Sequence, residues 1–178
     1  MRALLGAGAV LLLAAGCGGT SSPKEVGMEG TTSITVTSTA FAEGEPVPTT
    51  YTCEGADLAP PLAWTGVPDD AAALALVVDD PDAPHGMFTH WVVLDIPASV
   101  GGSTEGGVPS GGVQARNSAG RSAWMGPCPP SGTHHYRFTL YALSARTGLA
   151  EGASLDEALR AVQRLATASG RLTGTYRR

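Results

Sequence analysis

Short apolar runs, separated by glycine, proline and aspartate, dominate the hydrophobic pattern of the chain. Residues 33–37 alternate and are β-branched, which predicts a strand. Residues 73–78 and 91–96 are nearly continuous apolar runs that stop at aspartate or proline, and residues 136–143 form a fourth run. Runs of this length that end at turn-forming residues favour buried strands over helices.

One segment near the C-terminus has helical periodicity instead. Ser154 and Glu157 form the sequence signature of a capping box, so the helix is predicted to begin there. Gly170 is predicted to end the helix, since glycine commonly follows the last helical turn. The apolar residues that fall on one face of this helix are Leu155, Ala158, Leu159, Val162, Leu165 and Ala166.

Several strands followed by one late helix predict a mostly-β fold. We expect an antiparallel β-sandwich with one or more peripheral helices, including a C-terminal one. A parallel sheet would need a helix between successive strands, and no helical pattern separates residues 73–78 from 91–96. The length of 178 residues and the absence of a visible repeat indicate a single folded domain.

The N-terminal residues are typical of an export signal. Arg2 precedes about 13 apolar residues, a run too short to span a bilayer and typical of a signal peptide. Residues 13–17 resemble a bacterial lipobox, in which Cys17 would be lipidated, although Ala14 stands where leucine is usual. The alternative is an ordinary signal peptide and a secreted protein. We therefore divide the chain into a lipoprotein signal peptide with lipobox (1–17), a Gly/Ser/Thr-rich tether (18–30) and a domain (31–178).

Charge and cysteine content narrow the classes of function. The formal net charge is −5 and no basic run occurs apart from Arg177-Arg178, so no nucleic-acid partner is expected. Besides Cys17 the chain has Cys53 and Cys128. Export to an oxidising compartment would allow these two to form a disulfide, and the alternative is two free thiols near one pocket.

The candidate chemistry lies in two proline-rich segments, residues 79–91 and 126–136. All four histidines lie between residues 85 and 135. The loop after the run at 73–78 is long enough to bring His90 back beside Asp80, and a carboxylate beside an imidazole fixes its tautomer. His134 stands at the start of the last long predicted strand, with Tyr136 two residues later and therefore on the same strand face.

These two segments resemble the signatures of the phosphatidylethanolamine-binding protein family, in the form seen in bacterial Raf kinase inhibitor-like proteins. Residues 78–84 with His90-Trp91 are similar to the first signature, and residues 126–130 with 134–136 to the second. The resemblance runs from about residue 33 to the end. Two positions depart from it, since Trp124 stands where tyrosine is usual and His135 where arginine is common. Further similar segments are 51–55, 60–64, 154–161 and 174–176.

The resemblance implies an antiparallel β-sandwich with a small anion pocket at one end. Its expected ligand is phosphate, a carboxylate or a phospholipid head group, and the protein partner, if any, is not indicated. Tyr176 would cover the opening, as the tail tyrosine does in some members. The residues carried over as ligand-binding are Asp80, Asp82, Pro84, His90, Gly126, Pro127, His134 and Tyr136.

The resemblance also implies a binding protein with no catalytic residue, cofactor or metal, and an inhibitory or ligand-responsive interaction role can coexist with anion binding. The N-terminal signal and lipobox predict its location in the cell envelope. The alternative is a hydrolase or metal-dependent enzyme that uses Asp80, His90 and His134, with Ser131 as a nucleophile. No Gly-x-Ser-x-Gly elbow and no His-x-x-x-His or Cys-x-x-Cys spacing supports that alternative. A structural alternative also exists, in which these side chains only form turns and caps in the loops.

Overall fold

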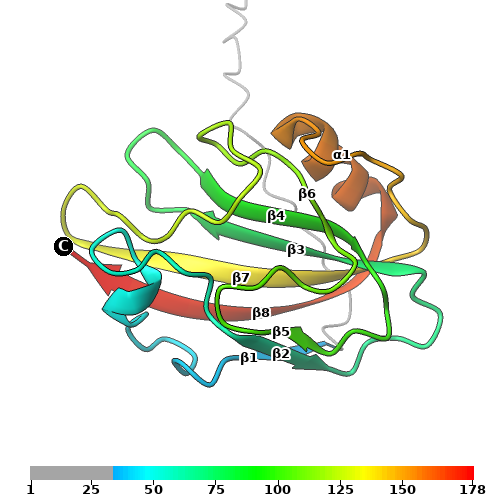
Figure 1. Cartoon of the computed structure of the whole chain (residues 1–178), viewed down its shortest axis with the longest axis horizontal. Helices are drawn as coiled ribbons and strands as arrows, with labels where there is room; N and C mark the ends of the chain where they lie inside the picture. The colour runs from blue at the N-terminus through cyan, green and yellow to red at the C-terminus, as the bar shows by residue number, and fades with distance from the viewer. Residues whose placement is uncertain (1–33) are drawn as a thin grey trace, which may run out of the picture.

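Two β-sheets and one α-helix make up residues 34–178, the part of the chain that the computed structural model describes (Figure 1). Cys17 and the predicted tether lie outside the described residues. Within residues 34–178, no helix combines the length and the apolar character needed to cross a bilayer. The elements are β1 (Thr35–Thr37), η1 (Thr49–Tyr51), β2 (Leu62–Thr65), β3 (Ala73–Asp80), β4 (Phe88–Ile96), β5 (Gly102–Ser103), β6 (Val113–Gln114), β7 (Thr133–Leu143), α1 (Leu155–Leu165) and β8 (Ala166–Arg177).

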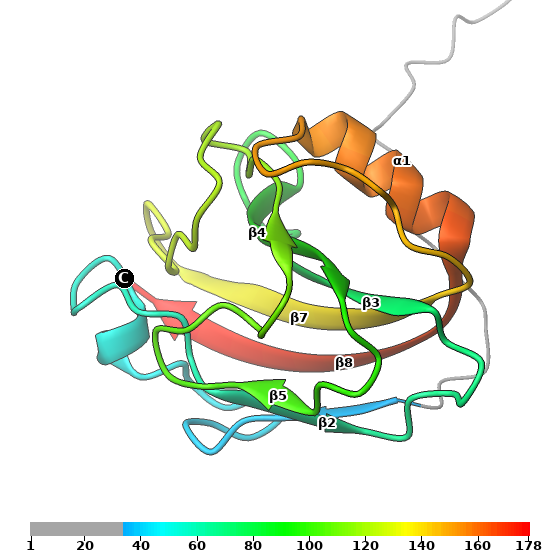
Figure 2. The same cartoon turned by 45° about the vertical axis from the view of Figure 1, so that its right-hand side comes forward.

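The strands form an antiparallel sandwich, which confirms the predicted fold class. The larger sheet has the order β6-β4-β3-β7-β8 and the smaller one β1-β2-β5. Every pair of neighbouring strands in both sheets is antiparallel. Figure 2 shows the smaller sheet against one face of the curved larger sheet and α1 against the other face.

The two faces of the larger sheet belong to two separate apolar clusters. Alternate residues of β3, Leu74, Leu76 and Val78, pack toward the smaller sheet. Their neighbours Ala75 and Val77 pack with Val162 and other residues of α1. A sheet that is covered on both faces needs apolar residues at successive positions. This explains why β3 appears in the sequence as a continuous apolar run.

The capping box at the start of α1 is confirmed, but the predicted end of the helix is wrong. Ser154 accepts a hydrogen bond from the Glu157 backbone, and the Glu157 side chain accepts one from the Ser154 backbone. The helix ends at Leu165, and Ala166 already has extended backbone angles. Gly170 lies inside β8 opposite Leu140, where a Cβ atom would collide with the Ile34 carbonyl oxygen. The glycine therefore permits close strand contact and does not end the helix.

Candidate functional site

A cavity of about 170 Å³ opens at one end of the larger sheet. Its walls come from the end of β3, the start of β4 and the start of β7, which are adjacent strands in the sheet, and from the loop before β7. The two proline-rich segments, which are about forty residues apart in sequence, therefore meet in one place. The residues that line the cavity are Asp80, Ala83, Pro84, Phe88, His90, Met125, Cys128, Pro129, Pro130, His134 and Tyr136.

Asp80 and His134 form a buried acid–base pair in the cavity wall. The distance from His134 Nδ1 to Asp80 Oδ2 is 2.7 Å, and both side chains are less than a tenth exposed. Because a carboxylate accepts hydrogen bonds, Nδ1 carries the proton in this contact. The other carboxylate oxygen, Oδ1, accepts a hydrogen bond from the Asp82 backbone N–H at 2.8 Å. Nε2 is thus the nitrogen of His134 that is left for a ligand.

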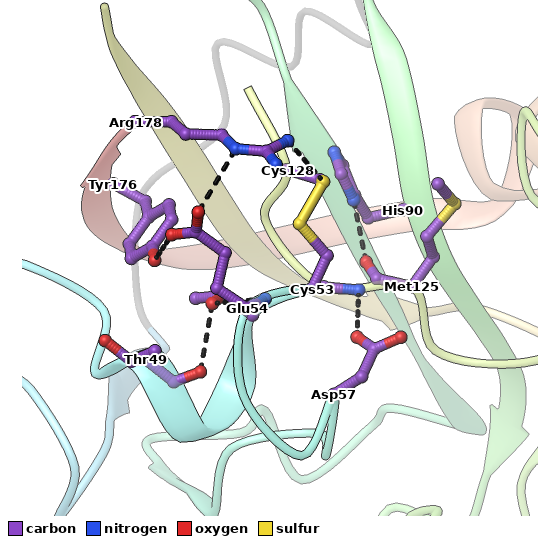
Figure 3. The surroundings of a disulfide bond; sticks show 11 residues. Thr49, Cys53, Glu54, Asp57, His90, Met125, Cys128, Tyr176 and Arg178 are labelled. Carbon is purple, nitrogen blue, oxygen red and sulfur yellow. Dashed lines mark hydrogen bonds and ion pairs between the residues drawn. A yellow bond between two sulfur atoms is a disulfide. The ribbon is translucent and has the colours of Figure 1, made fainter. Parts of the chain in front are cut away.

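His90 is held in the same tautomer by a different partner. Its Nδ1 lies 2.7 Å from the Met125 carbonyl oxygen, which can only accept a hydrogen bond (Figure 3). The ring packs edge-on against Phe88 and Tyr136, with centroid distances of 4.9 and 5.3 Å. Burial lowers the pKa of His90 below its ordinary value of 6.5, although the hydrogen bond to Met125 and the charge of Asp80 oppose this shift. The ring is therefore neutral at pH 7, with a lone pair on Nε2.

Tyr136 is one of the residues that line the cavity, and its buried hydroxyl has no hydrogen-bond partner of good geometry among the described residues. Burial raises the pKa of Tyr136, the negative charge of Asp80 raises it further, and the Cys128 backbone only partly offsets these effects. The hydroxyl therefore keeps its proton at any ordinary pH. A buried donor without a partner is uncommon in folded proteins, and a ligand oxygen would satisfy it.

Asp82 makes its contacts outside the cavity. Its Oδ2 accepts hydrogen bonds from the backbone N–H and from Nδ1 of His135, at 2.8 and 2.7 Å, and both side chains are exposed. The hydrogen bond from His135 lowers the pKa of Asp82. His134 and His135 point to opposite faces of β7, so the two aspartates pair with the two histidines on opposite sides of one strand.

Gly126 and Pro127 also lie outside the cavity wall, because they join the neighbouring turn. The Gly126 backbone N–H donates to Asp57 Oδ1 at 2.7 Å, and the Pro127 carbonyl accepts from the Cys53 backbone N–H at 3.1 Å. Asp57 has a positive φ of 54°, which is uncommon for a residue other than glycine. The backbone donor of Gly126 is therefore already used and does not face a ligand.

A disulfide joins Cys53 to Cys128 at this end of the molecule (Figure 3). Tyr176 lies nearby, and its hydroxyl donates to Glu54 Oε2 at 2.5 Å. Tyr176 is not among the residues that line the cavity, so the structure does not place it over the opening.

Five predicted residues thus come together in the cavity, and six other lining residues were not predicted. The five are Asp80, Pro84, His90, His134 and Tyr136. Phe88 could have been found from strand alternation, since it precedes His90 by two positions. Of the second segment, the sequence analysis selected Gly126 and Pro127, whereas Cys128, Pro129 and Pro130 form the wall.

Among the described residues, the cavity has neither a serine, threonine or thiol nucleophile nor a cluster of metal ligands for the alternative enzymatic functions. No serine, threonine or free thiol lines the cavity in the described part of the chain, and Ser131 is exposed outside it. Among residues 34–178, no three His, Cys, Asp or Glu side chains gather as a metal site.

The fold and the cavity place the chain among β-sandwich proteins with a pocket at one end of the sheet, and comparisons identify the class. Residues 37–177 match the phosphatidylethanolamine-binding protein family. The chain belongs to this family.

Sequence relatives and solved structures are both similar to this chain. LppC of Mycobacterium tuberculosis, named as a candidate lipoprotein, is 43% identical, with 96% of this chain and 93% of LppC covered. A UPF0098 protein of Methanothermobacter thermautotrophicus is 44% identical over 78% of this chain and 95% of its own. The crystal structure of Escherichia coli YbcL, described as a member of the mammalian family, superposes with a TM-score of 0.77 at 32% identity, covering 82% of this chain and 99% of YbcL. The Chlamydia trachomatis homologue CT736 also has a TM-score of 0.77, at 35% identity, with coverage of 83% and 99%.

Proposed function

We propose that this protein is a lipid-anchored binding protein of the cell envelope that holds a small anion in the Asp80/His90/His134 cavity, and that it is not an enzyme. The expected ligand is phosphate, a carboxylate or a phospholipid head group. A cavity of about 170 Å³ supports a small ligand, because drug-sized ligands occupy roughly 300–1,000 Å³.

The observation that carries the proposal is the set of unused polar atoms around one cavity. His90 and His134 each have Nδ1 bound to a fixed acceptor, so each offers Nε2 to a ligand. Tyr136 adds a hydroxyl donor that lacks a partner. Three polar groups on a mostly apolar wall are typical of a site that binds a small molecule in one orientation.

The protonation of His90 determines how an anion can bind. A neutral His90 presents a lone pair at Nε2 and would repel a fully deprotonated anion, with the Asp80 carboxylate nearby adding to the repulsion. Phosphate can bind if it brings a proton, as dihydrogen phosphate does, or if His90 takes one up from solution. In either case the complex holds one proton more than neutral His90 and the phosphate dianion, so the affinity should fall as the pH rises.

Calorimetric titration with inorganic phosphate at pH 5.5 and pH 8 tests this proposal. We expect tighter binding at pH 5.5, together with proton uptake that appears as a dependence of the heat on the ionisation enthalpy of the buffer. His90→Asn, whose amide can still donate to Met125, should reduce the pH dependence and the proton uptake, while His85→Asn in the exposed loop should not. Equal or stronger binding at pH 8 would contradict the role of the histidines.

The membrane anchor rests on the N-terminal sequence and on the name of LppC. Two acyl chains on Cys17 would hold the protein stably at a membrane, and the tether would keep the domain close to lipid head groups. We expect Cys17→Ser to move the protein from the membrane fraction to the soluble fraction of lysed cells. Retention of this variant in the membrane fraction would contradict lipidation at Cys17.

A further inference from the structure

The two cysteines of the disulfide face different surroundings. Cys53 is exposed at the surface, whereas Cys128 lines the cavity that contains His90 and His134. A reagent in solution can therefore approach the disulfide from the Cys53 side, and the sulfur released on the other side would belong to the cavity wall. The proposed binding of an anion does not itself require one cysteine at the surface and the other in the cavity wall.

A cation stands beside the cysteine that would be released. Arg178 Nη1 lies 3.6 Å from Cys128 Sγ, and its Nε lies 3.1 Å from Glu54 Oε1 (Figure 3). Glu54 also accepts a hydrogen bond from Tyr176, so it positions the last residues of the chain over the disulfide. The backbone N–H of Arg178 donates to the Gly132 carbonyl at 3.2 Å, which holds the main chain of this last residue beside the loop before β7. A nearby arginine lowers the pKa of a thiol and makes it a better leaving group.

The loop that contains Cys128 has other attachments that do not depend on the disulfide. Met125 accepts a hydrogen bond from His90, Gly126 donates to Asp57, and Pro127 accepts from Cys53. All three contacts use backbone atoms of the loop. Opening the disulfide would thus leave the cavity wall attached to the fold.

We propose that Cys53 is a site of thiol–disulfide exchange with a low-molecular-weight thiol, and that Cys128 is the leaving group. The thiolate of the incoming thiol attacks Cys53 Sγ and forms a new S–S bond with it. The Cys53–Cys128 bond breaks, and its electron pair remains on Cys128 Sγ as a thiolate beside Arg178. The incoming sulfur is oxidised and Cys128 is reduced, so no further reductant is needed.

The exchange also regulates the cavity, an inference that rests on the proposed anion-binding function. A thiolate at Cys128 adds a negative charge to a wall that already contains the Asp80 carboxylate. At the distances found within one small cavity, a like charge should weaken phosphate binding about threefold to tenfold. The oxidised form would then be the anion-binding form, and thiol exchange would release the anion.

The exchange is tested on the full chain with Cys17→Ser, which leaves Cys53 and Cys128 as its two cysteines. The native protein is incubated with glutathione, and intact mass and peptide mapping identify the modified residue. We expect one glutathione on Cys53, formed without denaturant. Arg178→Gln should slow the exchange about threefold or more, whereas Arg177→Gln, which removes the same charge one position earlier, should not. Glutathione on Cys128, exchange only in denaturant, or equal rates in both variants would overturn the assignment.

Phosphate titration at pH 7 of the oxidised and exchanged forms tests the regulation separately. The comparison uses glutathione and also cysteamine, whose amine carries a positive charge, because the attached group must not itself cause the effect. Weaker binding after exchange with each of the two thiols supports the inference. Unchanged affinity, or a loss with glutathione alone, overturns it. No phosphate binding even in the oxidised form would contradict the proposed function, while the mass measurement would still decide whether Cys53 exchanges.

Discussion

His134 Nδ1 lies 2.7 Å from Asp80 Oδ2, and this contact joins the end of β3 to the start of β7 inside the cavity wall. The same two strands are joined again by Asp79, whose Oδ1 accepts a hydrogen bond from Arg137 Nε at 2.6 Å. The side of β7 that faces solvent has the third contact, between Asp82 and His135. The buried member of this series has the largest consequence for stability, because an unpaired polar group costs most where water is excluded.

Asp80→Ala should therefore destabilise the fold more than Asp82→Ala. Removing the Asp80 carboxylate leaves a buried N–H donor on His134, which costs about 1–3 kcal/mol. The Asp82–His135 pair is exposed, and its loss should cost about 1 kcal/mol or less. Urea unfolding of the two variants in a phosphate-free buffer measures both values. Equal losses would mean that the burial of the pair has no energetic effect.

His90 should make the unfolding free energy depend on pH. Its pKa in the folded protein is lowered below 6.5, so between the folded value and 6.5 the unfolded chain binds more protons than the folded one. Stability is then complete above the unfolded pKa and falls as the pH drops through this window. Urea midpoints at pH 5 and pH 7 should differ less in His90→Asn than in the wild type. His85→Asn serves as the control, since that histidine is exposed, and an effect as large as that of His90→Asn would contradict the assignment.

Tyr136→Phe should separate binding from stability. The substitution removes a buried hydroxyl without a good hydrogen-bond partner, so the unfolding free energy should stay the same or rise by about 1 kcal/mol. Phosphate affinity at pH 5.5 should fall by about tenfold or more, because a hydrogen bond to a charged ligand is lost. Calorimetry and urea unfolding of the same preparation give both numbers. A large loss of stability with unchanged affinity would make Tyr136 a structural residue only.

The disulfide should contribute substantially to global stability. It closes a loop with a sequence separation of 75 residues, for which loop-closure entropy gives about 4 kcal/mol. We expect the double variant Cys53→Ser/Cys128→Ser to lose an amount of this order in urea unfolding. Cys17→Ser alone should have no effect on the same measurement. A loss below about 1 kcal/mol would show that the unfolded chain is constrained by other means.

The strands that the sequence analysis predicted are those with a strong local pattern. Residues 73–78 are apolar at every position, and they lie in β3 with both faces covered. β8 was not predicted, because its sequence consists largely of small and polar residues with two glycines. Its extended form comes from the pairing with β7, which runs along eleven pairs of residues from Thr133 to Leu143. Small or apolar residues do alternate with polar ones along β8, but glycine occupies two of the buried positions, so the alternation is weak as a hydrophobic signal.

In the candidate site, too, some features could be predicted from the sequence and others depend on the tertiary structure. The sequence motif could not distinguish Asp80 from Asp82 as a site residue, since both are carboxylates in one proline-rich segment. The geometry of the loop turns the first toward His134 in the cavity and the second toward His135 in solvent. The sequence likewise predicted that the second segment contributes to the site. The hydrogen bond from Gly126 to Asp57 turns the first residues of this segment away, so that Cys128, Pro129 and Pro130 form the wall.

The sequence by itself determined the fold class, the start of α1 and the two segments that contain the site, because each depends on residue types close together in the chain. Only the tertiary structure decided which side chains share the cavity, which nitrogen of each histidine is free, and that Cys53 reaches Cys128. These features depend on contacts between residues that are tens of positions apart. Such contacts are set by the strand order and by the packing of the two sheets, and local pattern does not encode them.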